Sequence, residues 1–276
     1  MSLEALLVLA AFAGLGLGAA VAAVLWLRRR RWLARVRRAC GRVGPRYPVV
    51  LLHGLFGFDE LALGPARVAY FRGLTGTIDQ LGTEVHRLRV ARTGRISLRA
   101  RQLARRIEAL DAKRVNLIAH SMGGLDARYA IARLGLSERV ASLVTIGTPH
   151  RGTPLADLGS RALGLAGLEL AAFRDLTTKR MAAFNRKVGD VRGVWYGSVV
   201  AHASGFALHP LLWPTQRLLL AREGPNDGVV SLASQAWGEV IAELEADHWA
   251  QIGWSPRFDA AELFEELLRE LRGRGF

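Results

Sequence analysis

The chain of 276 residues is poor in cysteine, and Cys40 is the single example. One cysteine excludes an internal disulfide and a zinc site built from cysteines. The sequence also lacks a Walker-type phosphate-binding loop, a dinucleotide-binding glycine pattern and any visible internal repeat. Half of the residues are hydrophobic and 22% are charged, so the composition is that of a folded protein rather than a disordered one.

Charge is absent from residues 5–27, which are rich in Leu, Ala, Val and Gly. A helix of this length extends about 34 Å, enough to cross the hydrocarbon core of a bilayer with some tilt. A cleaved signal peptide is the alternative, but it would have Lys or Arg before the apolar run and a small-residue cleavage site after it. Here Glu4 precedes the run, and Arg28–Arg31 follow it. We therefore expect an uncleaved transmembrane helix at about residues 5–27.

Acidic residues are scarce beside this segment. Residues 1–46 contain nine arginines and one acidic residue, so +8 of the formal net charge of +14 lies there. A basic chain can bind nucleic acid, but a basic cluster that directly follows an apolar helix favours phospholipid headgroups, and it stays on the cytoplasmic side. We expect residues 1–46 to form a single-pass anchor and linker in the inner (plasma) membrane, with a cytoplasmic domain at 47–276. A periplasmic or secreted domain is the alternative.

The most informative stretch is residues 115–124, which read Val-Asn-Leu-Ile-Ala-His-Ser-Met-Gly-Gly. An apolar strand that ends at a serine and leads into a helix, here residues 125–134, is the setting of a nucleophile elbow. The turn is tight, so the positions two before and two after the serine must be small, and they are Ala119 and Gly123. The pattern predicts Ser121 as a nucleophile, with an inert turn as the alternative.

A second apolar run, residues 49–52, leads into His53-Gly54-Leu55-Phe56-Gly57-Phe58. Hydrolases with a nucleophile elbow place one oxyanion donor after a strand that ends in this way. We expect the backbone N–H groups of Leu55 and of Met122, the residue after the predicted nucleophile, to form the oxyanion hole. An ordinary glycine-rich turn is the alternative.

Strand-like and helix-like segments alternate through the rest of this half. Residues 85–90, 140–146 and 194–200 have strand patterns, and residues 97–110 carry apolar positions at helical spacing with basic residues on the other face. Residues 61–70 look irregular and include a proline. The alternation predicts an α/β fold with a mostly parallel central sheet flanked by helices.

Two later segments are open to more than one interpretation. Residues 157–184 are longer than a simple β–α connection needs, and they suit either a core helix or a mobile cap that offers apolar surface to lipid. We expect a lid at about 155–187. Residues 206–220 suit a pocket wall or ordinary core.

A serine nucleophile needs a base, and the base needs an acid, in the chain order Ser, acid, His for this architecture. Asp227 lies in Gly-Pro-Asn-Asp-Gly-Val-Val, which we interpret as a turn feeding a strand. His248 is the only histidine after it, and the adjacent Asp247 is a poor alternative because neighbouring side chains rarely point the same way. Of the earlier histidines, His53 and His120 are expected to surround the site. The predicted triad is Ser121, Asp227 and His248.

From about Tyr47 to the end, the chain resembles the true lipases of bacteria, of the Pseudomonas/Burkholderia/Proteus type, with an elbow written as in the small Bacillus lipases. This resemblance implies an α/β-hydrolase fold, carboxylic ester hydrolysis, a helical lid and oxyanion donors at Leu55 and Met122. It rests on several motifs in the right order: residues 53–59, 115–124, 147–152, 176–178 with 184–185, 226–230 and 247–248.

Two features of that family are missing. Its secreted members hold a structural calcium through acidic residues near the catalytic His and upstream of the catalytic Asp, whereas here Ala250 stands two after His248 and no acid lies between Val191 and Leu220. The family's disulfide is impossible with one cysteine, which agrees with a cytoplasmic domain. We expect neither a metal nor an organic cofactor.

Together these patterns predict a membrane-anchored serine hydrolase that cleaves carboxylic esters of lipids. Its partners would be the lipid or ester substrate and membrane phospholipid, with no nucleic acid. The same site could serve a thioesterase, a phospholipase or an acyltransferase. From another class, an inactive membrane-tethered binding module with a fossil triad is the alternative.

Overall fold

The computed structural model describes residues 44–57, 60–63, 66–74, 82–165 and 170–276. The chain divides into two units, Met1–Val43 and Gly44–Phe276. The predicted transmembrane segment, residues 5–27, and Cys40 lie outside the described residues. Among the helices that the structure does describe, none is long and apolar enough to cross a membrane.

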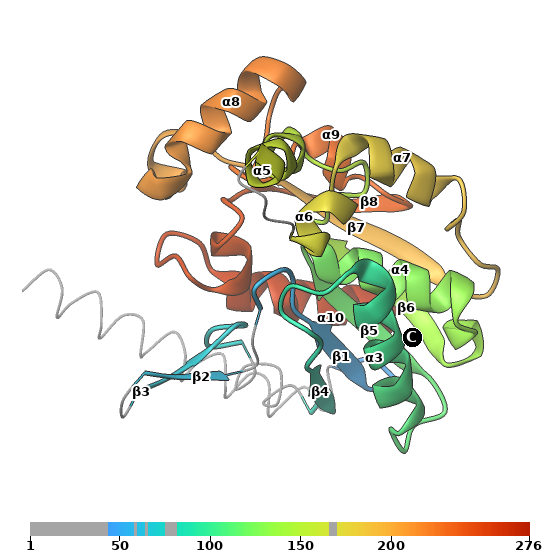
Figure 1. Cartoon of the computed structure of the whole chain (residues 1–276). Helices are drawn as coiled ribbons and strands as arrows, with labels where there is room; N and C mark the ends of the chain where they lie inside the picture. Colours follow the sequence, from blue (N-terminus) through green and yellow to red (C-terminus); the bar gives the residue numbers. More distant parts are fainter. Residues whose placement is uncertain (1–43, 58–59, 64–65, 75–81, 166–169) are drawn as a thin grey trace, which may run out of the picture. The chain divides into compact units, whose positions relative to one another are not determined.

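A parallel sheet forms the centre of the second unit (Figure 1). Its six strands lie in the order β4 (Val85–Leu88), β1 (Val49–Leu52), β5 (Val115–His120), β6 (Val140–Ile146), β7 (Trp195–His202) and β8 (Glu239–Glu245), and each neighbouring pair runs parallel. Every residue of β1, β5 and β6 is buried, as expected for parallel strands covered on both faces. The predicted α/β fold with a parallel central sheet is confirmed.

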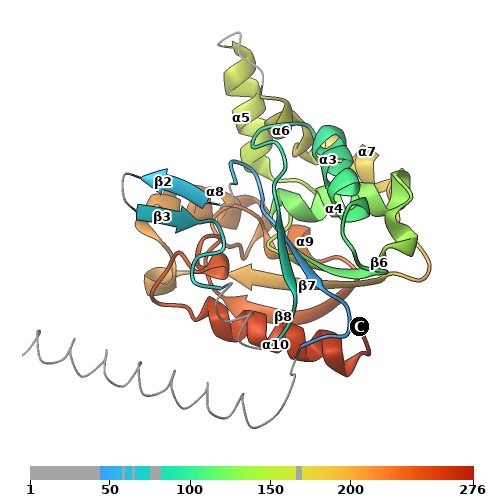
Figure 2. The same ribbon diagram turned by 90° about the horizontal axis from the view of Figure 1, so that it is seen from below.

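Helices cover both faces of this sheet. α3 (Ile96–Glu108) and α4 (Met122–Arg133) pack against each other on one face, and α10 (Ala260–Gly273) lies against the other (Figure 2). Leu103 and Ile107 of α3 are fully buried in a core that includes Leu117 of β5. Because α3 repeats its apolar residues at helical spacing, one stripe of the helix faces the sheet.

Further helices follow β6 and β7. α5 (Pro154–Leu165), α6 (Ala171–Asp175) and α7 (Thr178–Asn185) come after β6, and α8 (Trp213–Glu223) comes after β7. α5 contacts α6 and α8, and Figure 1 shows these three helices grouped beyond the sheet. Four short 3₁₀ turns complete the described helices: Leu136–Glu138, Gly205–Ala207, Pro210–Leu212 and Ala250–Ile252.

Residues 206–220 match the expectation of ordinary core only in part, since Leu208 and Leu212 belong to a buried cluster. Phe206, Leu211, Trp213 and Leu220 are exposed, whereas Leu212 and Leu219 are buried, and none of these side chains lines the cavity beside Ser121. α8 therefore presents large apolar side chains to solvent.

Four other elements, β2, β3, β8 and α9, depart from the sequence patterns. β2 (Glu60–Leu63) and β3 (Ala66–Ala69) pair antiparallel, where we expected irregular chain. β8 carries acidic residues on an exposed sheet edge, so no apolar run marked it. The turn around Asp227 leads into the short helix α9 (Leu232–Gln235) rather than into a strand.

Candidate active site

Ser121 stands at the junction between β5 and α4, with backbone angles φ 56° and ψ −132°. Positive φ is strained for a residue with a side chain, and such strain persists only where the surroundings enforce it. Gly123 is part of that enforcement, because a Cβ there would lie 2.9 Å from the carbonyl oxygen of His53 and 3.0 Å from that of Leu52. Only glycine lets α4 begin so close to the end of β1.

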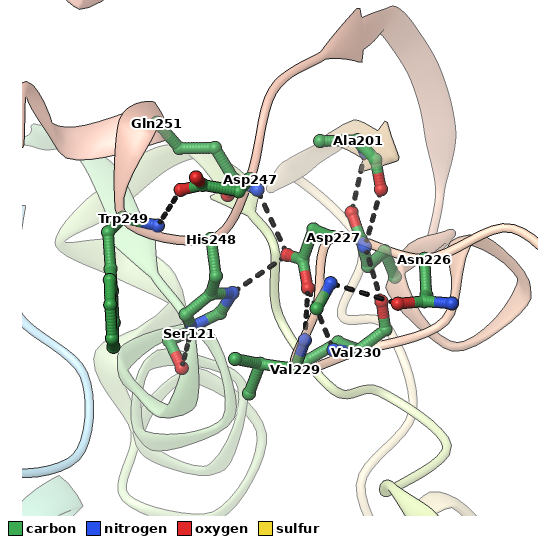
Figure 3. A network of polar contacts seen from close by, with 12 residues as sticks. Ser121, Ala201, Asn226, Asp227, Val229, Val230, Asp247, His248, Trp249 and Gln251 are labelled. Atoms are coloured by element: carbon green, nitrogen blue, oxygen red, sulfur yellow. Dashed lines mark hydrogen bonds and ion pairs between the residues drawn. The ribbon is translucent and has the colours of Figure 1, made fainter. Parts of the chain in front are cut away.

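The structure brings the three predicted triad side chains into one hydrogen-bonded line (Figure 3). Nε2 of His248 lies 3.0 Å from the Oγ of Ser121, and its Nδ1 lies 2.7 Å from Oδ2 of Asp227. All three residues are buried. A carboxylate only accepts, so Nδ1 carries the proton and Nε2 is left to accept from the serine hydroxyl. The pairing thus sets the tautomer that a general base requires.

The carboxylate of Asp227 is fully supplied with donors. Its Oδ1 accepts from the backbone N–H groups of Val229 (2.9 Å) and Val230 (2.8 Å), and its Oδ2 accepts from Nε2 of Gln251 (2.9 Å) in addition to His248. Hydrogen bonds to the charged form compensate for removing a carboxylate from water. The sequence offered no signal for Gln251, whose Oε1 has no hydrogen-bond partner among the described residues.

Asp247 holds the loop that carries His248. Its Oδ1 accepts from the N–H groups of Trp249 (2.9 Å) and Ala250 (2.8 Å), and its Oδ2 accepts from that of His209 (2.8 Å). The backbone N–H of His248 itself donates to the carbonyl of Asp227 at 2.9 Å. This loop is therefore fastened both to the acid's own turn and to the segment after β7.

The loop after β1 lies directly against the serine. A Cβ on Gly54 would come within 2.7 Å of the Cβ of Ser121, so glycine is required for this approach. Leu55, one predicted oxyanion donor, borders the cavity beside the serine. Met122, the other, is the first residue of α4, where backbone N–H groups have no acceptor within the helix.

A buried arginine orients this loop. One terminal nitrogen of Arg99 donates to the carbonyl oxygens of His53 (2.9 Å) and Gly54 (3.2 Å), and its Nε pairs with Asp126 at 2.8 Å. The C=O and N–H of a trans peptide point in opposite directions, so holding the Gly54 carbonyl directs the N–H of Leu55 to the other side. Burial raises the pKa of Asp126 to about 7, against the opposing effect of the Arg99 charge.

The position of Arg99 differs from the sequence-based expectation. The basic residues of α3 were expected on the helix's outer face, yet Arg99 is fully buried. Its partner Asp126 lies 27 positions further along the chain, on α4. Only the packing of α3 against α4 brings the two together, so no local pattern could have indicated the pair.

An apolar cavity of about 490 Å³ opens beside Ser121 and His248. Its other walls come from the loop after β1, from α5 and α6, and from the loop after β8. No lysine, arginine, aspartate or glutamate is among the lining residues, which are Leu55, Phe56, Tyr70, His120, Pro149, Thr153, Leu155, Ala156, Phe173, Leu176, Val229, Val230, Trp249, Ile252 and Trp254. Such a cavity suits an uncharged, apolar ligand.

Within the described part of the chain, no group of three His, Cys, Asp or Glu side chains is arranged to hold a metal ion.

A parallel sheet covered by helices on both faces, a strained serine between strand and helix, and an adjoining apolar cavity together define an α/β-hydrolase. In agreement, a solved metagenomic carboxyl esterase has the same fold, with a TM-score of 0.72 at 19% identity over 83% of this chain and 76% of its own. A family model described as palmitoyl protein thioesterase matches residues 48–184.

Sequence relatives make the assignment narrower. A triacylglycerol lipase of Vibrio cholerae is 42% identical over 253 residues, covering 74% of this chain and 78% of the relative. Triacylglycerol lipase 2 of Saccharomyces cerevisiae is 30% identical over 264 residues, covering 76% and 81%. The chain belongs to the triacylglycerol lipase family, as the motifs of the sequence indicated, and it is a carboxylic ester hydrolase.

Proposed function

We propose that this lipase-family hydrolase cleaves carboxylic esters of lipids with Ser121 as nucleophile, His248 as general base and Asp227 as the acid that orients the base. The observation that carries the proposal is the line from Ser121 through His248 to Asp227, with steps of 3.0 Å and 2.7 Å, next to an apolar cavity. The backbone N–H groups of Leu55 and Met122 form the oxyanion hole.

In this mechanism the Oγ of Ser121 attacks the ester carbonyl while Nε2 of His248 takes the hydroxyl proton. The tetrahedral oxyanion is stabilised by the two backbone donors, each worth about 3 kcal/mol in comparable hydrolases. Collapse breaks the bond to the alcohol, which leaves with the proton from His248. Water, deprotonated by the same histidine, then attacks the acyl-enzyme and releases the carboxylic acid and the free serine. Asp227 stabilises the imidazolium in both halves.

The substrate class follows from the cavity. Its walls are apolar and uncharged, so they favour neutral esters with apolar acyl chains over substrates that carry phosphate close to the ester. Leu155, Phe173 and Leu176, from the segment predicted as a lid at 155–187, contribute to these walls. We propose that this segment is a lid whose exposed residues, Leu158 and Leu165, meet lipid when it opens.

A thioesterase is the second candidate, because the family model that matches residues 48–184 is that of the palmitoyl protein thioesterases. The same serine, base and oxyanion donors would serve an acyl thioester, since only the leaving group differs.

The experiment combines a labelling reaction with a substrate panel. A fluorophosphonate probe should label the wild-type protein and leave Ser121→Ala unlabelled, and this variant should lose hydrolysis of p-nitrophenyl esters from acetate to palmitate while keeping its melting temperature. Comparable turnover by Ser121→Ala would end the nucleophile assignment. Acyl thioesters of N-acetylcysteamine, with the same acyl chains, separate the two candidates, because a thioesterase would prefer them to the oxygen esters.

Membrane attachment is a further part of the proposal. It rests on the sequence of residues 5–27 and on the arginines that follow, which lie outside the described residues. We propose a single-pass anchor in the inner membrane with the catalytic domain on the cytoplasmic side; the alternative is a periplasmic or secreted domain. Anionic headgroups would add about 1 kcal/mol per arginine near the surface.

Carboxyl-terminal fusions to alkaline phosphatase and to green fluorescent protein test this orientation. A fluorescent fusion without phosphatase activity is expected. Phosphatase activity with a dark fluorescent fusion would place the domain outside the cytoplasm and contradict the proposal.

A further inference from the structure

Two polar side chains next to the proposed triad have no role in the mechanism above. Tyr70 follows β3, and His120 is the last residue of β5, directly before Ser121. The ring of His120 is buried, with its centroid 4.5 Å from that of His248, and the Tyr70 ring is 5.8 Å from that of His120. Both residues border the cavity.

Hydrogen bonds join them to two different loops of the site. The hydroxyl oxygen of Tyr70 lies 3.1 Å from the backbone nitrogen of Gly54 and 2.7 Å from Nδ1 of His120. At the other side of the ring, Nε2 of His120 lies 3.1 Å from the carbonyl oxygen of His248. One chain of bonds thus runs from the loop after β1 to the loop after β8.

Donor and acceptor chemistry sets the direction of each bond. Burial and the adjacent His248 hold the pKa of His120 well below its usual range, so its ring is neutral and carries one N–H. The carbonyl of His248 only accepts, so that hydrogen is on Nε2, and Nδ1 accepts from the Tyr70 hydroxyl. The Tyr70 oxygen in turn accepts from Gly54. In all three hydrogen bonds, the donor therefore points towards the loop that carries His248.

We propose that Tyr70 and His120 are positioning residues that fix the oxyanion loop and the backbone of the catalytic base relative to each other. This inference rests on the proposed function, because it assigns Leu55 to the oxyanion hole and His248 to proton transfer.

The need for such a tie follows from the topology. Ser121 and Met122 are held by the continuous β5–α4 backbone, whereas Gly54 and His248 reach the site from opposite parts of the chain. Arg99 already fixes the carbonyl of Gly54. The Tyr70 hydroxyl fixes the N–H of Gly54. Through His120, the same hydroxyl connects the loop after β1 to the loop that carries His248. A shift of about 1 Å between oxyanion donors and base can cost two orders of magnitude in rate.

Three variants test the chain. Tyr70→Phe removes the hydroxyl and keeps the ring, His120→Asn keeps a group at the position of Nδ1 but no longer reaches the His248 carbonyl, and the third variant combines both. Each single change should lower kcat about tenfold with little change in KM. Because the residues act as one unit, the double variant should be no slower than the slower single variant. Affinity for an alkyl boronic acid, which mimics the tetrahedral intermediate, should fall in parallel with kcat.

Tyr196 provides the matched control. It is also a largely buried tyrosine whose hydroxyl accepts one backbone N–H, that of Val191 at 3.1 Å, but it lies away from the cavity. Tyr196→Phe should lower the melting temperature about as much as Tyr70→Phe and leave kcat unchanged. Melting curves of all variants separate misfolding from mispositioning.

The inference is overturned if Tyr70→Phe has a kcat within twofold of the wild type, or if the effects of the two single changes multiply in the double variant. Failure of the proposed function has a different signature: the wild type would not react with fluorophosphonate at Ser121. If only the positioning role is wrong, wild type and Tyr70→Phe react with this probe at equal rates.

Discussion

The loops at the carboxyl-terminal edge of the sheet and the helices above the cavity differ in which side chains they bury and which they expose to water. In the two loops that carry them, the carboxylates of Asp227 and Asp247 are buried, and their oxygens accept from backbone, amide or imidazole N–H groups. On α5 and in the segment leading into α8, Leu165 and Leu211 are 91% and 73% exposed. Polar groups are thus inside in one region, and apolar groups outside in the other.

This difference separates two tasks. Proton transfer needs atoms held in fixed positions, which a network of satisfied hydrogen bonds provides. Contact with lipid needs apolar surface that is free to meet it, which a folded protein otherwise keeps small. Changes in the first region should therefore alter kcat on every substrate, and changes in the second should matter for lipid aggregates alone.

Asp227→Asn should have the largest effect. The new amide would present an N–H to Nδ1 of His248 and force the wrong tautomer, so kcat should fall by about 10⁴-fold, as in a serine protease with the equivalent change. The fold should survive, because a flipped Gln251 amide can face the new side chain. Kinetics on p-nitrophenyl butyrate with a melting curve would measure both. A variant close to the wild type would mean that a different carboxylate orients His248.

Asp247→Ala should come second. It removes three hydrogen bonds from the loop around His248 and leaves buried N–H groups unpaired, so kcat should fall about tenfold or more together with the melting temperature. Asp259 is the matched control, since it also accepts from two backbone N–H groups, at the start of α10. Asp259→Ala should cost about 1 kcal/mol of stability and leave kcat intact. Equal kcat losses in both variants would remove the special role of the His248 loop.

Leu165→Ser tests the exposed region and should have a smaller, selective effect. Its side chain is almost fully exposed, so stability should change by less than about 0.5 kcal/mol. Hydrolysis of a long-chain ester emulsion should fall a few-fold while a soluble short-chain ester is cleaved as before. Val240 on β8 is also apolar, and its exposed fraction is 49%. As the control, Val240→Ser should change neither rate. Equal rates on the emulsion for both variants would speak against a lipid-facing lid.

Chelation should have the smallest effect of all. The loop around His248 is held by Asp247 and by backbone bonds, so treatment with EDTA should leave activity and melting temperature unchanged. A fall of several degrees, restored by added calcium, would reveal a metal site that neither the sequence nor these contacts indicated.

The sequence was informative where a local pattern makes a local structure. Apolar runs predicted β1, β5 and β6, and the small residues around Ser121 predicted its turn. Asp227 and His248 were named from chain order, and the structure brings both to Ser121, although their roles remain predictions. Arg99, Tyr70 and Gln251 could not be named, because their meaning depends on partners from distant segments. β8 was missed for a related reason: an exposed edge strand needs no apolar alternation.

The position of the acid and the base has a consequence for how the protein would lose activity on heating. Asp227 lies between β7 and β8, and His248 follows β8, which within the described residues is an edge strand paired with β7 alone and is largely exposed. Such edges open locally at a lower free energy than the fully buried strands β1, β5 and β6. Local unfolding of β8 would move Asp227 and His248 away from Ser121 while the interior of the sheet stays folded. Activity would then be lost at a lower temperature than the one at which the core of the sheet melts.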